Sequence, residues 1–294
     1  MNKLLIIICF CFIQISVFGQ FNESILRQND TIKVNYKELA LVGTIIPVTM
    51  TGVYIYLNNV WWRDDRVPFH ITDELELHYA LNLDKAGHFI SSYFVSTVFC
   101  DVLQVTGLTK NQAVWGGAAL SIINSGIVEV KDGLSPYWGF SKFDMLANTC
   151  GALLPVLQYK YPFFQNIHFN WSYDFSHPSY YKSLPERKDA SFIDDYERQN
   201  FWITFDAARA FFPDKDHSKF PYFLDPAFGM SAQNLDGKGS GQYEWFLGLD
   251  INLSKLKFVD KPFEKVVSKY LYFYHWPEPA LRLHPQVTVY PITY

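Results

Sequence analysis

The sequence predicts an α+β protein, in which an antiparallel, membrane-affine bundle of about four helices is followed by a smaller β-rich carboxy-terminal domain. Long apolar segments punctuated by capping residues predict the bundle over 36–165. Apolar and polar residues alternate along 243–253, which is typical of a half-buried strand. Only 18% of the residues are charged, against about 25% in an ordinary soluble domain, and 49% are hydrophobic.

The amino terminus has the pattern of a signal peptide. Lys3 supplies the positive charge, and residues 4–18 form the apolar region. Cleavage after Gly19 would leave Gln20 as the first residue of a polar segment over 20–35. We therefore predict a signal peptide at 1–19 and an exported protein of the cell envelope, either membrane-associated or periplasmic. A retained membrane anchor is the alternative.

The first helical segment lies in a stretch without charged residues, 39–62. It is long enough to span a bilayer, which takes about 20 residues. Aromatic residues gather toward its carboxy end, including Trp61 and Trp62, as they do at membrane interfaces. A transmembrane helix and a buried core helix both fit this pattern.

Three more helices follow, and capping signals mark their ends. Short connections between them indicate antiparallel neighbours. The predicted start and end residues are Asp84 and Gly107, Thr109 and Gly133, and Ser141 and Tyr161.

The carboxy-terminal half has a different character. Residues 166–200 are polar and rich in aromatics, and we predict a linker there, followed by a β-rich domain over 201–294. The segments 201–205, 243–253 and 281–290 are predicted strands, and 263–274 is a predicted short helix. These strands are too few for an outer-membrane barrel, which needs at least about eight.

Polar residues at helical spacing lie at the start of the second helix, the end of the third and the start of the fourth. In an antiparallel bundle these three positions share one end, so we predict a polar cluster there, capped by the loop 134–140. The candidate catalytic residues are His88, Glu129 and Asp144, and the candidate ligand-binding residues are Asp84, Lys85, Asp132, Ser141 and Asn148.

Each of these residues also has a structural interpretation. Asp84 is a candidate helix N-cap, and Asp144 a candidate partner in a capping box headed by Ser141. Asn148 is a candidate interhelical hydrogen-bonding residue, and His88 a candidate buried histidine paired with a carboxylate. Glu129 and Asp132 fit a structural role least well, because negative charge at a helix carboxy terminus opposes the helix dipole.

The blocks Asp84-Lys85-Ala86-Gly87-His88-Phe89, Glu129 with Lys131-Asp132-Gly133, and Ser141 with Asp144, Asn148 and Gly151 carry a resemblance. The region from about 84 to 157 resembles the YfiM-type family of predicted periplasmic lipoproteins and, more distantly, VanZ-like membrane proteins. The resemblance implies an envelope location and the same polar cluster, but no established activity. The chain departs from the lipoprotein pattern, because Cys9 and Cys11 lie inside the apolar run.

Two functional hypotheses follow. The first is a structural or accessory envelope protein that contacts membrane lipid or other envelope components. The second is a hydrolase or transferase acting on a lipid-linked or cell-wall substrate, with His88 as general base and Glu129 or Asp144 orienting it; in one variant these three residues bind a divalent metal. A net charge of −4 and the lack of basic clusters argue against nucleic acid as a partner. No cofactor or protein partner is identified by the sequence.

Overall fold

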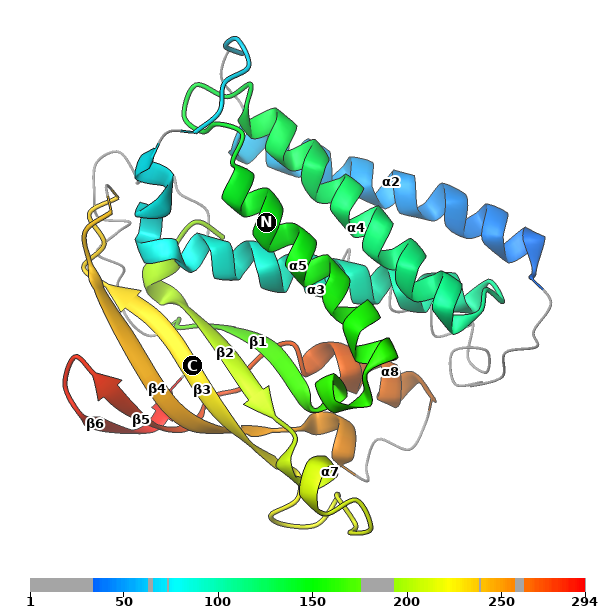
Figure 1. The fold of residues 1–294 in the computed structure, drawn as a ribbon, viewed down its shortest axis with the longest axis vertical. Coiled ribbons are helices and arrows are strands. Elements are labelled where there is room, and N and C mark those ends of the chain that lie inside the picture. The colour runs from blue at the N-terminus through cyan, green and yellow to red at the C-terminus, as the bar shows by residue number, and fades with distance from the viewer. Residues whose placement is uncertain are drawn as a thin grey trace.

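The computed structural model describes residues 34–62, 66–72, 74–175, 193–237, 239–256 and 262–293. The predicted signal peptide and nearly all of the polar segment 20–35 lie outside these residues. Within them the α+β prediction is confirmed: long helices form one part of the molecule and an antiparallel sheet the other (Figure 1).

The four long helices form the first part, and α3 is central, packed against both α4 and α5. α2 lies along the outer side of the bundle (Figure 1). Near its start the Asn35 amide donates to the Thr106 carbonyl, and near its end Asn58 Oδ1 accepts a hydrogen bond from Lys131 of α4 at 3.3 Å. Glycine allows the helices to approach closely, since a Cβ atom at Gly117 would lie 2.7 Å from the Ser96 carbonyl oxygen, and one at Gly151 would overlap the Phe89 carbonyl. The bounds are α2 Tyr36–Val60, α3 Leu83–Val105, α4 Lys110–Asp132 and α5 Lys142–Lys160.

Two of the predicted helix starts are confirmed and one is wrong. Thr109 caps α4 in a capping box with Gln112, and Ser141 caps α5 by accepting a hydrogen bond from the Asp144 amide at 2.8 Å. Asp84 is not an N-cap. α3 begins one residue earlier, at Leu83, directly after a left-handed turn in which Ala80, Leu81 and Asn82 have φ values of 46°, 53° and 62°.

The sheet has six antiparallel strands in sequence order, so each strand pairs with the next along the chain. Its bounds are β1 Ile167–Tyr173, β2 Gln199–Phe205, β3 Leu224–Gln233, β4 Gln242–Ile251, β5 Glu278–His284 and β6 Thr288–Thr293. Short helices join these parts: η1 Glu74–Leu77, η2 Tyr79–Asn82, η3 Pro162–Asn166, η5 Tyr196–Arg198, α7 Ala207–Phe211, η6 Leu253–Lys255 and α8 Pro262–Leu271.

Three details of the predicted β-rich half are wrong. The expected linker 166–200 contains β1 and the start of β2. The polar residues of β1 suggested an exposed segment, but Asn170 and Ser172 are fully buried. The strand expected over 281–290 is a hairpin of β5 and β6. β3 was not predicted, since Pro226 and Gly229 lower its strand propensity.

The sheet is packed on the bundle, and the two parts share a hydrophobic core. Leu83 and Ile90 of α3 share a core with Phe201 of β2 and with Leu235. The Phe89 and Phe169 rings also meet edge to face, with centroids 4.7 Å apart. α3 therefore lies between the sheet on one side and α4 on the other (Figure 1).

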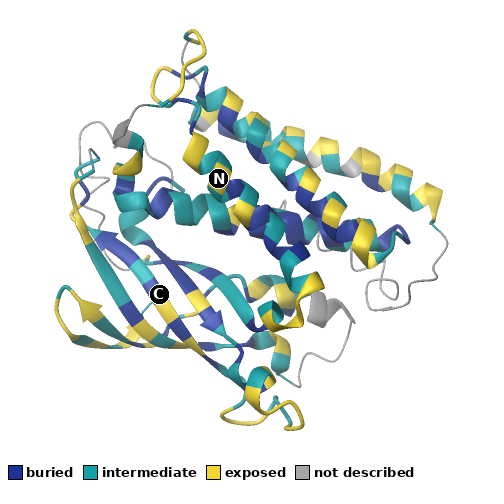
Figure 2. Ribbon diagram, in the orientation of Figure 1, coloured by how far each residue is buried: buried dark blue, intermediate teal, exposed yellow. Residues whose placement is uncertain are grey.

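Three helical segments in the described part of the chain are long and apolar enough to cross a membrane, judged by length and composition alone. They differ in how far the protein itself covers them. The apolar window is 6% buried in Tyr36–Asn59, 39% in Lys110–Asp132 and 50% in Tyr79–Val105. Figure 2 shows exposed residues along the outer sides of α2 and α4.

Candidate functional site

The structure brings the predicted polar residues together at one end of the bundle. The start of α3, the end of α4 and the start of α5 meet there, as the antiparallel arrangement requires. Seven of the eight candidates are linked by hydrogen bonds or ion pairs, and these residues are called the polar cluster below: Asp84, Lys85, His88, Glu129, Ser141, Asp144 and Asn148.

Lys85 lies among carboxylates. Its Nζ is 2.7 Å from Asp84 Oδ2, 2.7 Å from Asp144 Oδ1 and 3.4 Å from Glu76 Oε1. Burial alone would lower the pKa of Lys85, but the attraction of Asp84 and Asp144 outweighs it and holds that pKa above its usual range. Burial raises the pKa of Asp84 to about 6, although Lys85 opposes the rise.

His88 faces three oxygen-bearing side chains. Its Nδ1 is 3.3 Å from Asn148 Oδ1 and 3.7 Å from Glu129 Oε1, and its Nε2 is 3.7 Å from Asp144 Oδ2. One ligand atom each from His88, Glu129 and Asp144 lies within 4.8 Å of the others. The His88 side chain is 27% exposed, so solvent reaches this group.

Glu129 is the most deeply buried member, with 1% of its surface exposed. Its two carboxylate oxygens accept hydrogen bonds from the Ser141 amide and from Asn148 Nδ2, each at 3.3 Å. Burial raises its pKa to about 9, and the nearby negative charges of Asp144 and Asp132 add to the rise. Near neutral pH Glu129 is therefore protonated and uncharged.

Asn148 links the three helices. Its Oδ1 accepts a hydrogen bond from Ser92 Oγ of α3 at 2.8 Å, and its Nδ2 donates to Glu129 of α4. Ser92 Oγ also lies 2.9 Å from Ser125 Oγ, and Ser121 Oγ donates to the Ser92 carbonyl at 2.9 Å. Buried polar side chains thus form a continuous network between α3, α4 and α5.

Asp132 stands apart from the polar cluster. Its Oδ1 accepts a hydrogen bond from Trp62 Nε1 at 2.6 Å, which ties the end of α4 to the segment that follows α2. Burial raises the pKa of Asp132 to about 7. Asp132 closes the same helix as Glu129, so its sequence position predicts the same location for both side chains.

Glu76 also contacts the polar cluster, although the sequence pattern does not identify it. It lies in η1, its Oε2 accepts a hydrogen bond from Thr72 Oγ1, and its Oε1 faces Lys85. The residue belongs to an irregular connection without a periodic pattern, so its sequence position carries no signal of the contact.

Residues 76–160 match a family model described as "Predicted periplasmic lipoprotein (DUF2279)". The match contains every residue of the polar cluster as well as Glu76, and it confirms the predicted location in the cell envelope. Neither the curated proteins nor the solved structures contain a match to the chain.

The donor set of the polar cluster suits two kinds of chemistry. An imidazole and two carboxyl groups are ligands that several divalent metals accept, and Glu129 would lose its proton on binding one. The same imidazole beside a carboxylate is also the arrangement of a general base with an orienting partner. The network around Asn148 would hold either arrangement in place.

Proposed function

We propose that this chain is an accessory protein of the cell envelope that lies against a membrane through the outer face of α2 and α4, called the apolar face below. The main observation in support is the set of large apolar side chains that this face exposes. Its members on α2 are Leu41, Val48, Val53 and Ile55, and those on α4 are Trp115, Ile123, Ile127 and Val130.

The position of the sheet favours contact along one face over a bundle that crosses the membrane. The sheet and α8 together cover one side of α3 over much of its length. Phe169 of β1 packs on Phe89 near the start of α3, and Lys269 of α8 pairs with Asp101 near its end. Were α3 to cross a bilayer, the polar groups of the sheet would have to enter the hydrocarbon with it, at high cost. Within the described part of the chain the apolar window of α2 is only 6% buried, and exposed residues lie along the outer sides of α2 and α4 (Figure 2).

In this proposal the polar cluster is structural. It joins three helices through buried hydrogen bonds, and Lys85, which lies between Asp84 and Asp144, offsets part of its negative charge. The finer resemblance to the YfiM-type family, and the more distant one to VanZ-like membrane proteins, also belongs to the proposal. Both agree with an envelope protein in contact with lipid.

Flotation with vesicles of phosphatidylethanolamine and phosphatidylglycerol tests the membrane contact. The mature protein should float with the vesicles and be released by a carbonate wash, as a surface-bound protein is. Ile123→Glu with Ile127→Glu should abolish flotation, because two charges would enter the apolar face. Val287→Glu is the matched control, since Val287 is 69% exposed in the β5–β6 turn, away from this face.

Resistance to the carbonate wash would contradict this proposal and would indicate a bundle that spans the membrane. Flotation of the Ile123→Glu/Ile127→Glu protein at the parental level would show that this face does not carry the contact.

A second candidate function is supported by the geometry of His88, Glu129 and Asp144. Their ligand atoms lie close enough together to hold one divalent ion, and the His88 side chain is partly exposed to solvent. Such an ion would serve a hydrolase or transferase acting on a lipid-linked or cell-wall substrate. Titration of the metal-free protein with Zn²⁺ and Mn²⁺ tests this candidate, and His88→Ala should remove a binding isotherm that His284→Ala leaves intact.

A further inference from the structure

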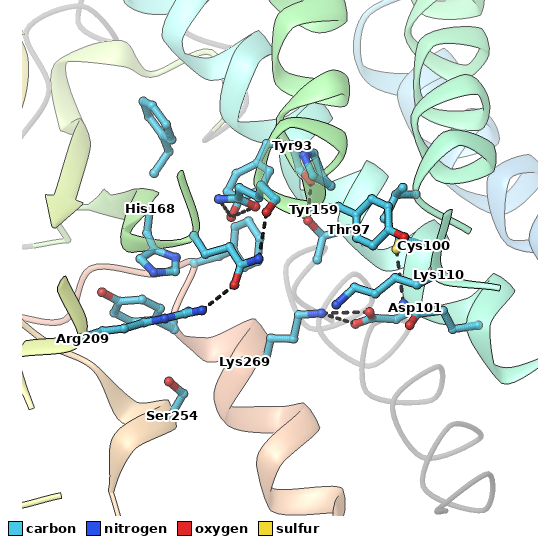
Figure 3. A pocket seen from close by; sticks show the side chains of 18 residues that line it. Tyr93, Thr97, Cys100, Asp101, Lys110, Tyr159, His168, Arg209, Ser254 and Lys269 are labelled. Atoms are coloured by element: carbon cyan, nitrogen blue, oxygen red, sulfur yellow. Dashed lines mark hydrogen bonds and ion pairs between the residues drawn. The ribbon is translucent and has the colours of Figure 1, made fainter. Parts of the chain in front are cut away.

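A second polar site lies at the opposite end of the bundle, where the helices meet the sheet. A cavity of about 260 Å³, open to solvent on one side, is lined there by the second half of α3, the end of α5, the start of α4, β1 and the segments around α7 and α8. Figure 3 shows its lining side chains, which include Tyr93 and Thr97 of α3 and His168 of β1. None of the sequence-predicted site residues lines it.

The cavity has an apolar part. The rings of Tyr93 and Phe273 pack with centroids 4.8 Å apart, and Phe169 packs against Tyr93 at 6.4 Å. Val114 and Pro155 also line it. This wall suits a hydrocarbon or aromatic body.

The charged lining is unequal in sign. Three cationic side chains, Lys110, Arg209 and Lys269, line the cavity against one carboxylate, Asp101. Lys269 binds both oxygens of Asp101, at 2.8 and 2.6 Å, so this pair is neutral by itself (Figure 3). Two cations remain without a carboxylate partner among the described residues.

The contacts of those two cations are with neutral groups. Arg209 Nη2 donates to Gln165 Oε1, which belongs to a chain of hydrogen bonds that continues through Gln158 to Tyr93. Lys110 Nζ lies 6.0 Å from the centre of the Tyr159 ring. The Arg209 fork keeps donors that can bind a phosphate or carboxylate group.

His168 adds no countercharge. It lies in the wall beside Tyr272, with ring centroids 5.0 Å apart, and burial lowers its pKa to about 4, so the ring is neutral near pH 7. The cavity thus combines an apolar wall, neutral hydrogen-bonding groups and an excess of positive charge at its mouth.

We propose that this cavity binds an anionic amphiphile, a molecule with a phosphate or carboxylate head and an apolar tail. The head would lie between Arg209 and Lys110, and the tail against Tyr93, Phe169 and Phe273. Both cations are exposed at the cavity mouth, so neutral substitutions there leave the core packing unchanged.

Isothermal titration calorimetry of the full mature chain tests this proposal, with dodecyl phosphate below its micellar concentration as the probe. The expected result is saturable binding at one site. Arg209→Gln and Lys110→Gln should each weaken it by about tenfold or more, the loss expected when a charged hydrogen bond is removed. Lys142→Gln is the matched control, because Lys142 is an exposed cation at the other end of the bundle.

Two further probes distinguish the contribution of the head to the affinity from that of the tail. Inorganic phosphate and dodecanol should each bind at least about tenfold more weakly than dodecyl phosphate. Equal binding of inorganic phosphate would identify a small free anion as the ligand, and equal binding of dodecanol would show that charge plays no part. Either result would overturn the proposal, as would parental affinity in both cavity variants.

Ile123→Glu with Ile127→Glu distinguishes this site from the apolar face. That variant should keep its affinity for dodecyl phosphate even if it no longer floats with vesicles. Loss of saturable binding in this variant alone would place the amphiphile on the apolar face and contradict a site in the cavity.

Discussion

Hydrogen bonding and burial have opposite effects on the pKa of Glu129. The Ser141 amide and Asn148 Nδ2 both donate to its carboxylate, which favours the ionised form. Burial and the neighbouring Asp144 favour the protonated form, and they dominate. A carboxylic acid that is neutral near pH 7 avoids the unfavourable interaction of a negative charge with the carboxy terminus of α4.

This balance predicts a pH effect on stability. The pKa of Glu129 is raised in the folded state, so its contribution to the unfolding free energy is fully present below about pH 4.5. That contribution is lost as the pH rises toward about 9, by up to about 1.4 kcal/mol per pH unit. In Glu129→Gln this loss is absent, so the difference in unfolding free energy between variant and parent should shift in favour of the variant from pH 5 to pH 8. Urea unfolding at several pH values measures it, and a pH-independent difference would contradict the raised pKa.

Asn148 is the residue whose loss should cost most within the network. Asn148→Ala leaves the buried Ser92 hydroxyl and the Glu129 carboxyl each without one partner, which predicts a loss of about 1–3 kcal/mol in unfolding free energy. Asn124→Ala is the control, because Asn124 lies partly exposed on α4, and it should change stability by less than about 0.5 kcal/mol. Chemical denaturation of both variants measures these losses in unfolding free energy. Similar losses in the two variants would argue against a stabilising hydrogen-bond network around Asn148.

At the scale of elements, close helix packing depends on where glycine lies. Gly151 of α5 meets the backbone of α3 at Phe89, so a methyl group in Gly151→Ala would force the helices apart. We expect a loss of about 1–3 kcal/mol in thermal or chemical unfolding. Gly126→Ala on α4 is the matched control: its added Cβ would meet nothing closer than Met145 Cε at 3.9 Å. That variant should be neutral or more stable by up to about 1 kcal/mol.

Elements whose ends are fixed by local chemistry could be predicted from the sequence. Thr109 with Gln112, and Ser141 with the Asp144 amide, are caps whose partners lie three residues away, so their spacing was sufficient. The start of α3 could not be predicted, because three residues in the left-handed region precede it and tertiary contacts hold them there. β1 was missed for a similar reason, since its polar residues are buried against partners far along the chain, such as Asn170 against Thr204 and Tyr272.

In the candidate site, too, regular helices made some contacts predictable and irregular segments made others unpredictable. The antiparallel order of the helices was sufficient to predict that His88, Glu129 and Asp144 converge. The contact of Glu76 with Lys85 and the separation of Asp132 depend on irregular segments, for which spacing gives no information.

At the scale of the whole molecule, the bundle and the sheet share one core and should unfold together. Phe201 of β2 is 4% exposed and packs with Leu83 and Ile90 of α3. Phe201→Ala should lower the unfolding free energy by about 3–5 kcal/mol and shift the far-ultraviolet and tryptophan-fluorescence transitions equally. Ile203→Ala, two residues along the strand at a position 46% exposed, is the control and should have a small effect. Two separate transitions in the parent protein would instead identify independent domains.

The left-handed turn before α3 couples the two layers mechanically. Its three consecutive non-glycine residues are in the left-handed region of backbone conformation, which costs roughly 1–2 kcal/mol each. Residues of the sheet restrain this turn. Tyr243 Oη donates to the Leu81 carbonyl at 2.8 Å, and Leu81 Cδ1 lies 3.3 Å from the position that a Cβ atom on Gly241 would take. The hairpin between β3 and β4 therefore holds the strained turn in its conformation through contacts with Leu81. The turn leads directly into the first residues of α3, which carry Lys85 and His88. An event that displaces this hairpin, such as a partner binding or a proteolytic cut, would therefore remove the two contacts with Leu81 from the segment that precedes the polar cluster.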